Sequence, residues 1–351
     1  MPSHVVNHGV SLVTRALVAA LLLSSVTTWV ACGGGGGAGG GAGGTGAGAT
    51  GGSGQTGGAS AGGDPLLGAF IVTLAAPVPA SATTAATPGS TTILGRVSDG
   101  ATPALTYSKQ TAADGACQLL VPVSPFCATP CGSGACVADG VCQAYPMVQN
   151  LGDASIDGIN CGGATTGVAL KNTSGNYQLP SGVACVYPGF AEGDTVRLTT
   201  TGGDLPAFNV TTVGIAPLAL TNASLPLAAG QALTLTWKAA SNPKASRVHV
   251  KLDISHHGGS RGAVTCDSDD TGSVTISGDL MTKLLALGVA GYPTVIVTRT
   301  STGTASLAKG HVELRVSSEF QTPVQIAGLE SCGSDEECPT GKTCQADLTC
   351  K

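Results

Sequence analysis

The stretch VHVKLDISHHGGSRG carries the side chains best suited to acid–base or metal chemistry. His256 and His257 are adjacent in a glycine-rich loop that follows an apolar–polar alternation. Imidazole binds metals and moves protons near neutral pH, and loops on a rigid scaffold often carry such groups. His249 and Asp253 share one face of the expected strand, but about 13 Å at strand rise is too far for one ion. His256 and His257 are therefore candidate metal or catalytic residues, and a solvated polar loop is the simpler interpretation.

A second group places three carboxylates within four positions of the turn CDSDDTGS: Asp267, Asp269 and Asp270. Calcium favours oxygen-rich loops, so these residues are a candidate calcium site, and calcium is the one cofactor that the sequence leaves open. The spacing differs from an EF-hand loop, because Asp270 follows Asp269 directly and no glutamate closes the loop. Aspartate and glycine also suit any tight β-turn, so a turn without an ion is the alternative.

Motifs of the common enzyme classes do not occur from residue 65 onward. There is no GxSxG elbow, P-loop, HExxH or dinucleotide fingerprint there. The sequence favours binding over catalysis. The competing class is a secreted metal-dependent hydrolase or metal-binding protein that uses His256 and His257. A third class, a substrate-carrying lipoprotein serving a transporter, predicts a large apolar pocket.

Cysteine is the other chemically informative residue type. The chain has 13, of which Cys32 lies near the N-terminus and the other twelve lie from residue 117 onward. An even dozen in an exported chain predicts up to six disulfides formed in an oxidising compartment. The disulfide candidates are Cys117, Cys127, Cys131, Cys136, Cys142, Cys161, Cys185, Cys266, Cys332, Cys338, Cys344 and Cys350.

Eight of these cysteines form two loosely similar clusters, at 127–142 and 332–350. The second cluster is too short to build a hydrophobic core, so disulfides must hold it. Four cysteines allow three pairings; first-to-third with second-to-fourth is the compact, interlaced choice, and the sequence does not select among them. Neither cluster has a CxxC pair or a histidine, which argues against zinc.

The first 31 residues predict a secretory signal peptide. A weakly positive head with His4, His8 and Arg15 precedes the apolar run ALVAALLL. This run is too short, and too soon interrupted by serine and threonine, to span a membrane. Export also explains how the cysteines meet an oxidising compartment.

The end of that segment, Trp29-Val30-Ala31-Cys32, resembles the lipobox of bacterial lipoproteins. Val30, Ala31 and Cys32 match the motif, and Trp29 stands where leucine is typical. The resemblance implies cleavage before Cys32 and an acyl anchor on Cys32 that enters the lipid bilayer. It also implies an outer-membrane or cell-surface location, and a freely secreted protein is the alternative.

Residues 32–64 are expected to be a flexible, glycine-rich linker. Between positions 33 and 63, 19 of 31 residues are glycine, and no side chain there can offset the entropy of ordering. The root-mean-square reach of such a coil is about 30 Å. The linker would hold a folded body away from the lipid surface.

From residue 65 onward the pattern predicts an all-β protein. Short apolar segments alternate with threonine and serine between glycine, proline and aspartate turns, which is typical of β-sandwiches. We expect two β-sandwich-like domains, at 65–215 and 216–328, and a four-cysteine disulfide-rich module at 329–351. The strands expected in the first domain are 69–74, 91–97, 118–123, 167–171, 195–200 and 208–213.

The second domain carries the clearest expected strand pair, QALTLTWKA and RVHVKLDIS, joined by a turn at Ser241-Asn242-Pro243. Alternation places Leu233, Leu235 and Trp237 on one face, and Trp237 is expected in the core. The remaining expected elements are strands at 263–266 and 273–276, a helix at 279–287 capped by Ser277 or Asp279, and a hairpin of 294–300 with 312–316.

Charge limits the choice of partners. The net charge is −5, charged residues make up 11% of the chain, and no basic block occurs, which argues against nucleic acid and anionic membranes. We expect an exported, surface-tethered lipoprotein that acts in binding, adhesion or envelope display. Its ligand, a protein or a glycan, is not identified by the sequence.

Overall fold

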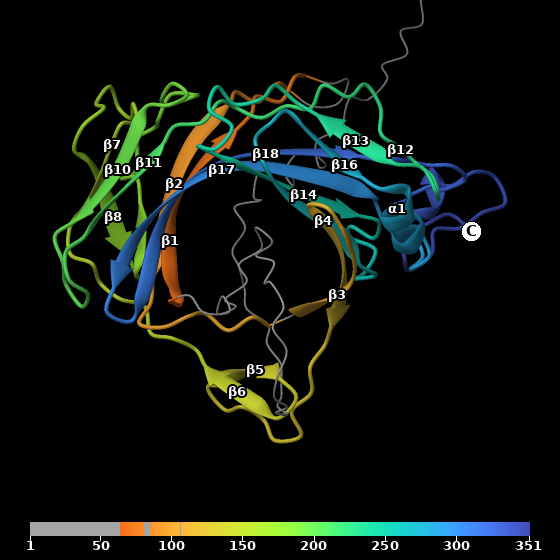
Figure 1. Ribbon diagram of the computed structural model, residues 1–351, viewed down its shortest axis with the longest axis horizontal. Coiled ribbons are helices and arrows are strands. Elements are labelled where there is room, and N and C mark those ends of the chain that lie inside the picture. The colour runs from red at the N-terminus through yellow and green to blue at the C-terminus, as the bar shows by residue number, and fades with distance from the viewer. Residues whose placement is uncertain (1–63, 81–84, 106) are drawn as a thin grey trace, which may run out of the picture. The chain divides into compact units, whose positions relative to one another are not determined.

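The computed structural model describes residues 64–80, 85–105 and 107–351 (Figure 1). The expected signal peptide, Cys32 and the linker up to residue 63 lie outside the described residues. The described residues form nineteen strands, one α-helix and one short 3-10 helix. The regular secondary structure of the described residues is therefore almost entirely β, which confirms the all-β fold class.

Thirteen strands form one large sheet, in the order β11-β10-β7-β8-β9-β2-β1-β18-β17-β14-β15-β4-β3 (Figure 1). Neighbouring strands are antiparallel except β1 and β18, which are parallel. Their bounds are β1 (Leu66–Ala75), β2 (Ser90–Val97), β3 (Tyr107–Asp114), β4 (Cys117–Val123), β7 (Ala154–Asp157), β8 (Val168–Thr173), β9 (Asn176–Gln178), β10 (Thr195–Thr200), β11 (Asn209–Val213), β14 (Arg247–Asp253), β15 (Ala263–Asp269), β17 (Thr294–Leu307) and β18 (Gly310–Pro323).

The remaining strands form three two-stranded sheets. They pair β12 (Pro226–Leu227) with β19 (Gln325–Ile326), β13 (Leu233–Thr236) with β16 (Ser273–Ile276), and β5 (Gly134–Ala138) with β6 (Val141–Ala144). The helix α1 (Gly278–Leu285) begins at Ser277, whose side chain accepts a hydrogen bond from the Leu280 N–H. Of the two expected caps, Ser277 is the one used. The 3-10 helix η1 covers Asp335–Glu337.

Two hydrophobic cores lie against the large sheet. The first gathers β1, β2, β7, β8, β10 and β11, and the second gathers β13, β14, β15, β16 and α1. The chain passes from the first core to the second between Ile215 and Leu218. Two elements cross this division. The β17–β18 hairpin supplies side chains to both cores, and Cys117 and Leu119 of β4 lie in the second core.

The two strands expected to pair in the second half are both present, but they do not pair with each other. β13 pairs with β16, while β14 lies between β15 and β17. Their faces follow the expected alternation, with Leu235, Trp237 and Val250 buried. The segment that joins them passes beside β17, since the Lys238 carbonyl accepts a hydrogen bond from the Arg299 guanidinium.

Six disulfides are formed, as the cysteine count predicted. Both clusters pair first with third and second with fourth: Cys127–Cys136 and Cys131–Cys142, then Cys332–Cys344 and Cys338–Cys350. Cys117–Cys266 joins facing positions of β4 and β15, and Cys161–Cys185 joins a bridged pair in the first half of the chain. The interlaced arrangement is thus adopted twice, at two separate places in the chain.

Candidate functional site

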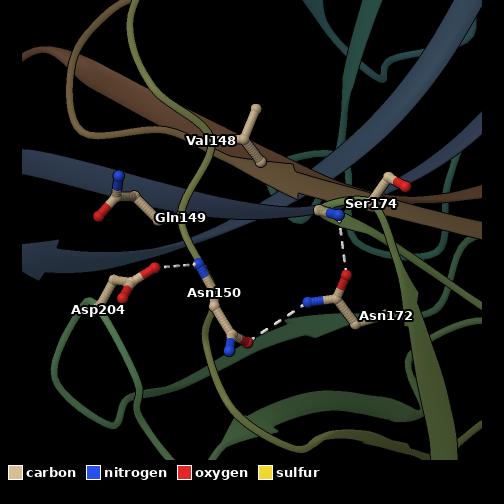
Figure 2. A pocket seen from close by; sticks show the side chains of 7 residues that line it. Val148, Gln149, Asn150, Asn172, Ser174 and Asp204 are labelled. Atoms are coloured by element: carbon tan, nitrogen blue, oxygen red, sulfur yellow. Dashed lines mark hydrogen bonds between the residues drawn. The ribbon is translucent and has the colours of Figure 1, made fainter.

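A polar pocket of about 380 Å³ lies where three separate segments meet (Figure 2). Val148, Gln149 and Asn150 come from the segment before β7; Asn172, Ser174 and Gly175 come from the end of β8 and the turn into β9; Asp204 comes from the loop between β10 and β11. The volume is within the range of small-ligand sites. None of these residues was a candidate from the sequence.

Asn150 is the centre of this arrangement. Its Oδ1 accepts hydrogen bonds from the Gly152 N–H at 3.1 Å and from the Asn172 Nδ2 at 3.3 Å. The buried Tyr177 hydroxyl lies 3.0 Å from the same oxygen and accepts the Leu151 N–H at 2.7 Å. The Asn150 side chain is therefore held in one orientation before any ligand arrives.

The Asp204 carboxylate is fixed on the other side of Asn150. Its Oδ2 accepts the Asn150 N–H at 2.8 Å, and the Asp204 N–H donates to the Asn150 carbonyl at 2.7 Å (Figure 2). Its second oxygen, Oδ1, has no hydrogen-bond partner within the described residues. Thus Oδ2 of Asp204 fixes the loop to Asn150, and Oδ1 is available to accept a hydrogen bond from a ligand.

The β8–β9 turn forms the third wall. Ser174 and Gly175 both have positive φ, at 52° and 81°, in the two-residue turn that closes this hairpin. The Asn172 Oδ1 accepts the Gly175 N–H at 2.8 Å. A Cβ on Gly175 would lie 2.2 Å from a methyl group of Val148, so glycine is required where the turn meets this wall.

The pocket offers both donors and acceptors. Within the described residues, the Asn150 Nδ2, the Ser174 hydroxyl and the Gln149 Oε1 have no hydrogen-bond partner, nor does the free Asp204 oxygen. Asp204 is the only ionisable group among the lining residues. Mixed donors and acceptors without a cation suit a neutral ligand rich in hydroxyl groups, and they do not suit an anion.

The candidate histidines have a different environment. The rings of His256 and His257 lie 4.0 Å apart, and His257 has a φ of 63°. The His256 carbonyl accepts the Tyr292 N–H at 2.8 Å. Partial burial lowers the pKa of His256, and the neighbouring His257 lowers it further, while Asp253 acts in the opposite direction. The neutral form of the His256 imidazole is therefore favoured relative to a free histidine.

The loop with these histidines supports the C-terminal module. Gly291, one residue before Tyr292, donates its N–H to the Asp347 carbonyl at 2.7 Å, and its own carbonyl accepts the Ser331 hydroxyl at 2.6 Å. The backbone of His256 thus holds the segment on which the four-cysteine module docks. This is a structural contribution of the loop that its side-chain chemistry did not reveal.

The three aspartates of the candidate calcium turn point to three different partners. Asp267 lies 3.1 Å from the His249 Nδ1, and Asp269 lies 2.6 Å from the Arg247 guanidinium. Asp270 is fully buried and pairs with Arg299. The structure therefore does not bring the three carboxylates to one point, nor does it bring them to His256 and His257.

The Asp270 carboxylate has a complete set of donors. Arg299 contacts it through Nε at 2.6 Å and Nη2 at 3.0 Å, the Trp237 indole donates at 2.7 Å, and the Ser246 hydroxyl donates at 2.7 Å. Arg299 also donates to the carbonyls of Ala216 and Lys238. Burial alone would raise the pKa of Asp270, but the hydrogen bonds from Arg299, Ser246 and Trp237 outweigh it and lower the pKa. Sequence reasoning placed Trp237 in the core but missed its partner.

Two cysteine sets are the groups of the described chain whose ligand atoms lie close enough for one metal ion, within 4.8 Å of one another. They are Cys127, Cys131, Cys136 and Cys142, and Cys332, Cys338 and Cys344. All seven sulfurs are engaged in disulfides. In this oxidised form they offer no thiolate to a metal.

Comparisons with known proteins leave the function open. No family model matches the chain, and no curated protein matches it. A crystal structure of the chicken CNTN1 FN1–FN3 domains is similar over 67% of this chain and 78% of that one, at 10% identity and a TM-score of 0.19. This TM-score is too low to relate the two folds. Among the described residues, no helix has the length and apolar character needed to cross a bilayer.

Proposed function

We propose that this protein is an exported, surface-tethered lipoprotein that binds a neutral, hydroxyl-rich ligand, of which a glycan is the natural example. The observation that carries this proposal is the pocket of Figure 2, with its unpaired donors and acceptors on a fixed frame. Adhesion or display at the envelope is the corresponding role. Gln149, Asn150, Ser174 and Asp204 would contact the ligand.

The proposed location at the cell surface depends on features other than the pocket. The sequence Trp29-Val30-Ala31-Cys32 and the glycine-rich segment after it support an acyl anchor at Cys32 and a spacer. The six disulfides support folding in an oxidising compartment. A lipid anchor and a β fold cross-linked by disulfides suit a protein that must remain folded outside the cytoplasm.

Binding is favoured over hydrolysis by the placement of the candidate catalytic groups. His256 and His257 follow the Asp253 end of β14, whereas Asp270 follows Asp269, which pairs with Arg247 at the opposite end of that strand. The Asp270 carboxylate is also already paired with Arg299. Asp267 and Asp269 are likewise engaged with other residues. The pocket, by contrast, has polar atoms without a hydrogen-bond partner among the described residues.

The test is direct binding of neutral oligosaccharides to the purified mature protein, measured on a glycan array and by calorimetry. We compare the Gln149→Ala, Ser174→Gly double variant with the parent. Glycine accepts the positive φ of position 174, so the fold should persist while two ligand contacts are lost. We expect affinity to fall about tenfold or more, since each hydrogen bond contributes about 0.5–1.5 kcal/mol.

Gln110→Ala is the matched control, because Gln110 is exposed on β3 and outside the pocket. It should leave affinity unchanged. If the parent bound only acidic glycans, the assignment of this pocket to a neutral ligand would be wrong. Equal affinity of the parent and the double variant would also contradict it.

A further inference from the structure

Exposed large hydrophobic side chains concentrate in one short segment of the described chain. Nine such residues are exposed: Val78, Leu94, Tyr107, Phe126, Val141, Tyr145, Met147, Val186 and Tyr292. Four of the nine fall within residues 124–147, which we call the Cys-rich hairpin. Phe126 is 72% exposed in a chain with only five phenylalanines.

The Cys-rich hairpin is a rigid support for these side chains. It contains β5 and β6 and the two interlaced disulfides Cys127–Cys136 and Cys131–Cys142. The Gly140 N–H donates to the Phe126 carbonyl at 3.2 Å, which brings the backbone of Phe126 to the residue that precedes Val141. Because the hairpin is already ordered, burying these two residues against a partner costs little conformational entropy.

Charge is nearly absent from the same segment. Of its 24 residues, counted from 124 to 147, one is ionisable other than cysteine or tyrosine: Asp139. The Asp139 carboxylate accepts the Phe126 N–H at 3.0 Å, so it serves the hairpin itself. There is no lysine, arginine, histidine or glutamate in the segment to match a charged partner.

We propose that the Cys-rich hairpin inserts Phe126 and Val141 into the headgroup–acyl boundary of a neutral lipid surface. A lipid interface accepts aromatic and aliphatic side chains without a complementary shape, whereas specific protein interfaces usually add a polar and charged rim. The β5–β6 ladder pairs backbone groups between Gly134 and Ala144 internally, which lowers the cost of bringing this part of the hairpin to the interface. This proposal is independent of the ligand in the polar pocket.

The experiment uses the full chain with Cys32→Ser, so that no acyl group is present, in one processed form verified by intact mass. Co-sedimentation with phosphatidylcholine vesicles gives the partition coefficient. Phe126→Ser with Val141→Thr should lower it about tenfold, because two exposed apolar contacts are lost. Leu94→Ser with Val186→Thr is the matched control, since these residues are 53% and 52% exposed outside the hairpin.

The control should change partitioning by less than about twofold. Vesicles with added phosphatidylglycerol should bind no better, because the hairpin has no cation to attract them. Three results overturn the proposal: no partitioning of the parent, equal loss in the control, or binding that needs anionic lipid and disappears in salt. Circular dichroism and intact disulfides must show that each variant remains folded.

Discussion

At the scale of single residues, the Asp270 carboxylate depends on Arg299 for its charge. Both side chains are buried, at 0% and 2% exposure, and every oxygen of the carboxylate has a donor. A buried pair of this kind adds little stability over an apolar replacement of both partners. Removing one partner is different, because the other is left charged without compensation.

Arg299→Met should therefore destabilise the protein strongly. It keeps an unbranched side chain of similar reach but leaves Asp270 without its cation, so we expect the free energy of unfolding to fall by about 3–5 kcal/mol. Urea denaturation at pH 7 measures this. Lys283→Met is the control, because Lys283 and Asp279 form an exposed pair on α1 and should lose about 0.5 kcal/mol or less.

The change in the free energy of unfolding at acid pH provides a second test of the Asp270–Arg299 pair. The pKa of Asp270 is lowered in the folded protein, so its contribution to stability is present above the unfolded pKa of about 3.9 and is lost as pH falls through the folded value. The parent should lose stability below about pH 4, and Arg299→Met should lose less of it there. Similar acid slopes for parent and variant would show that the pair does not act as described.

Residue types alone could not have indicated this role for Asp270. In the sequence it is one of three aspartates in a turn, and its partner is 29 positions away on another strand. The polar pocket escaped prediction for the same reason. Asn150, Asn172 and Asp204 are ordinary surface residues, and only the pairing of β7, β8 and β10 brings their segments together.

At the scale of elements, the alternation of apolar and polar residues predicted which face of a strand is buried better than it predicted which strands pair. Residues 195–200 and 273–276 were predicted with the bounds observed, because one strictly alternating face is buried in each. β13 was placed beside the wrong strand, since alternation states which side is buried and not which strand is adjacent. β3 was missed because only Ala112 in it is partly covered, so the strand has no apolar face to recognise.

The disulfide between β4 and β15 is the element-scale feature with the largest expected effect. Cys117 and Cys266 are 149 positions apart, so their bond closes a very long loop of the unfolded chain. Replacing both by alanine should lower the free energy of unfolding by about 3–5 kcal/mol in the chain-entropy account. Equilibrium denaturation of the oxidised protein in urea measures the change.

The Cys161–Cys185 pair offers a comparison within the same molecule, since its separation is only 24 residues. Its double alanine variant should lose about 1.6 kcal/mol less than the Cys117, Cys266 variant. Equal losses, or a larger loss for the shorter loop, would show that native packing around the sulfurs outweighs loop length.

At the scale of the whole molecule, both cores belong to one compact unit of the described residues. The β17–β18 hairpin contributes to each core, and polar contacts reinforce the connection. The Glu192 carboxylate accepts the Ser241 N–H at 2.6 Å and lies 3.1 Å from the Ser241 hydroxyl. A ligand bound in the first half would therefore act on the same continuous sheet that carries the second half.

Counting the cysteines that can be alkylated before and after reduction tests the proposed anchor in the whole molecule. Six disulfides use twelve of the 13 cysteines, which leaves Cys32 alone. For protein purified from membranes, we expect an intact mass that begins at Cys32 and includes acyl chains. No thiol should be alkylated before reduction, and twelve should be alkylated after it, because the Cys32 sulfur is already blocked.

Cys32→Ser separates the anchor from the disulfides. This variant should appear in the soluble exported fraction without acyl mass and should still gain twelve alkylated cysteines after reduction. If the parent instead starts at another residue without lipid, the protein is freely secreted and the tether has no anchor. Free thiols in the unreduced parent would argue against the disulfide framework and return the two cysteine clusters to consideration as metal sites.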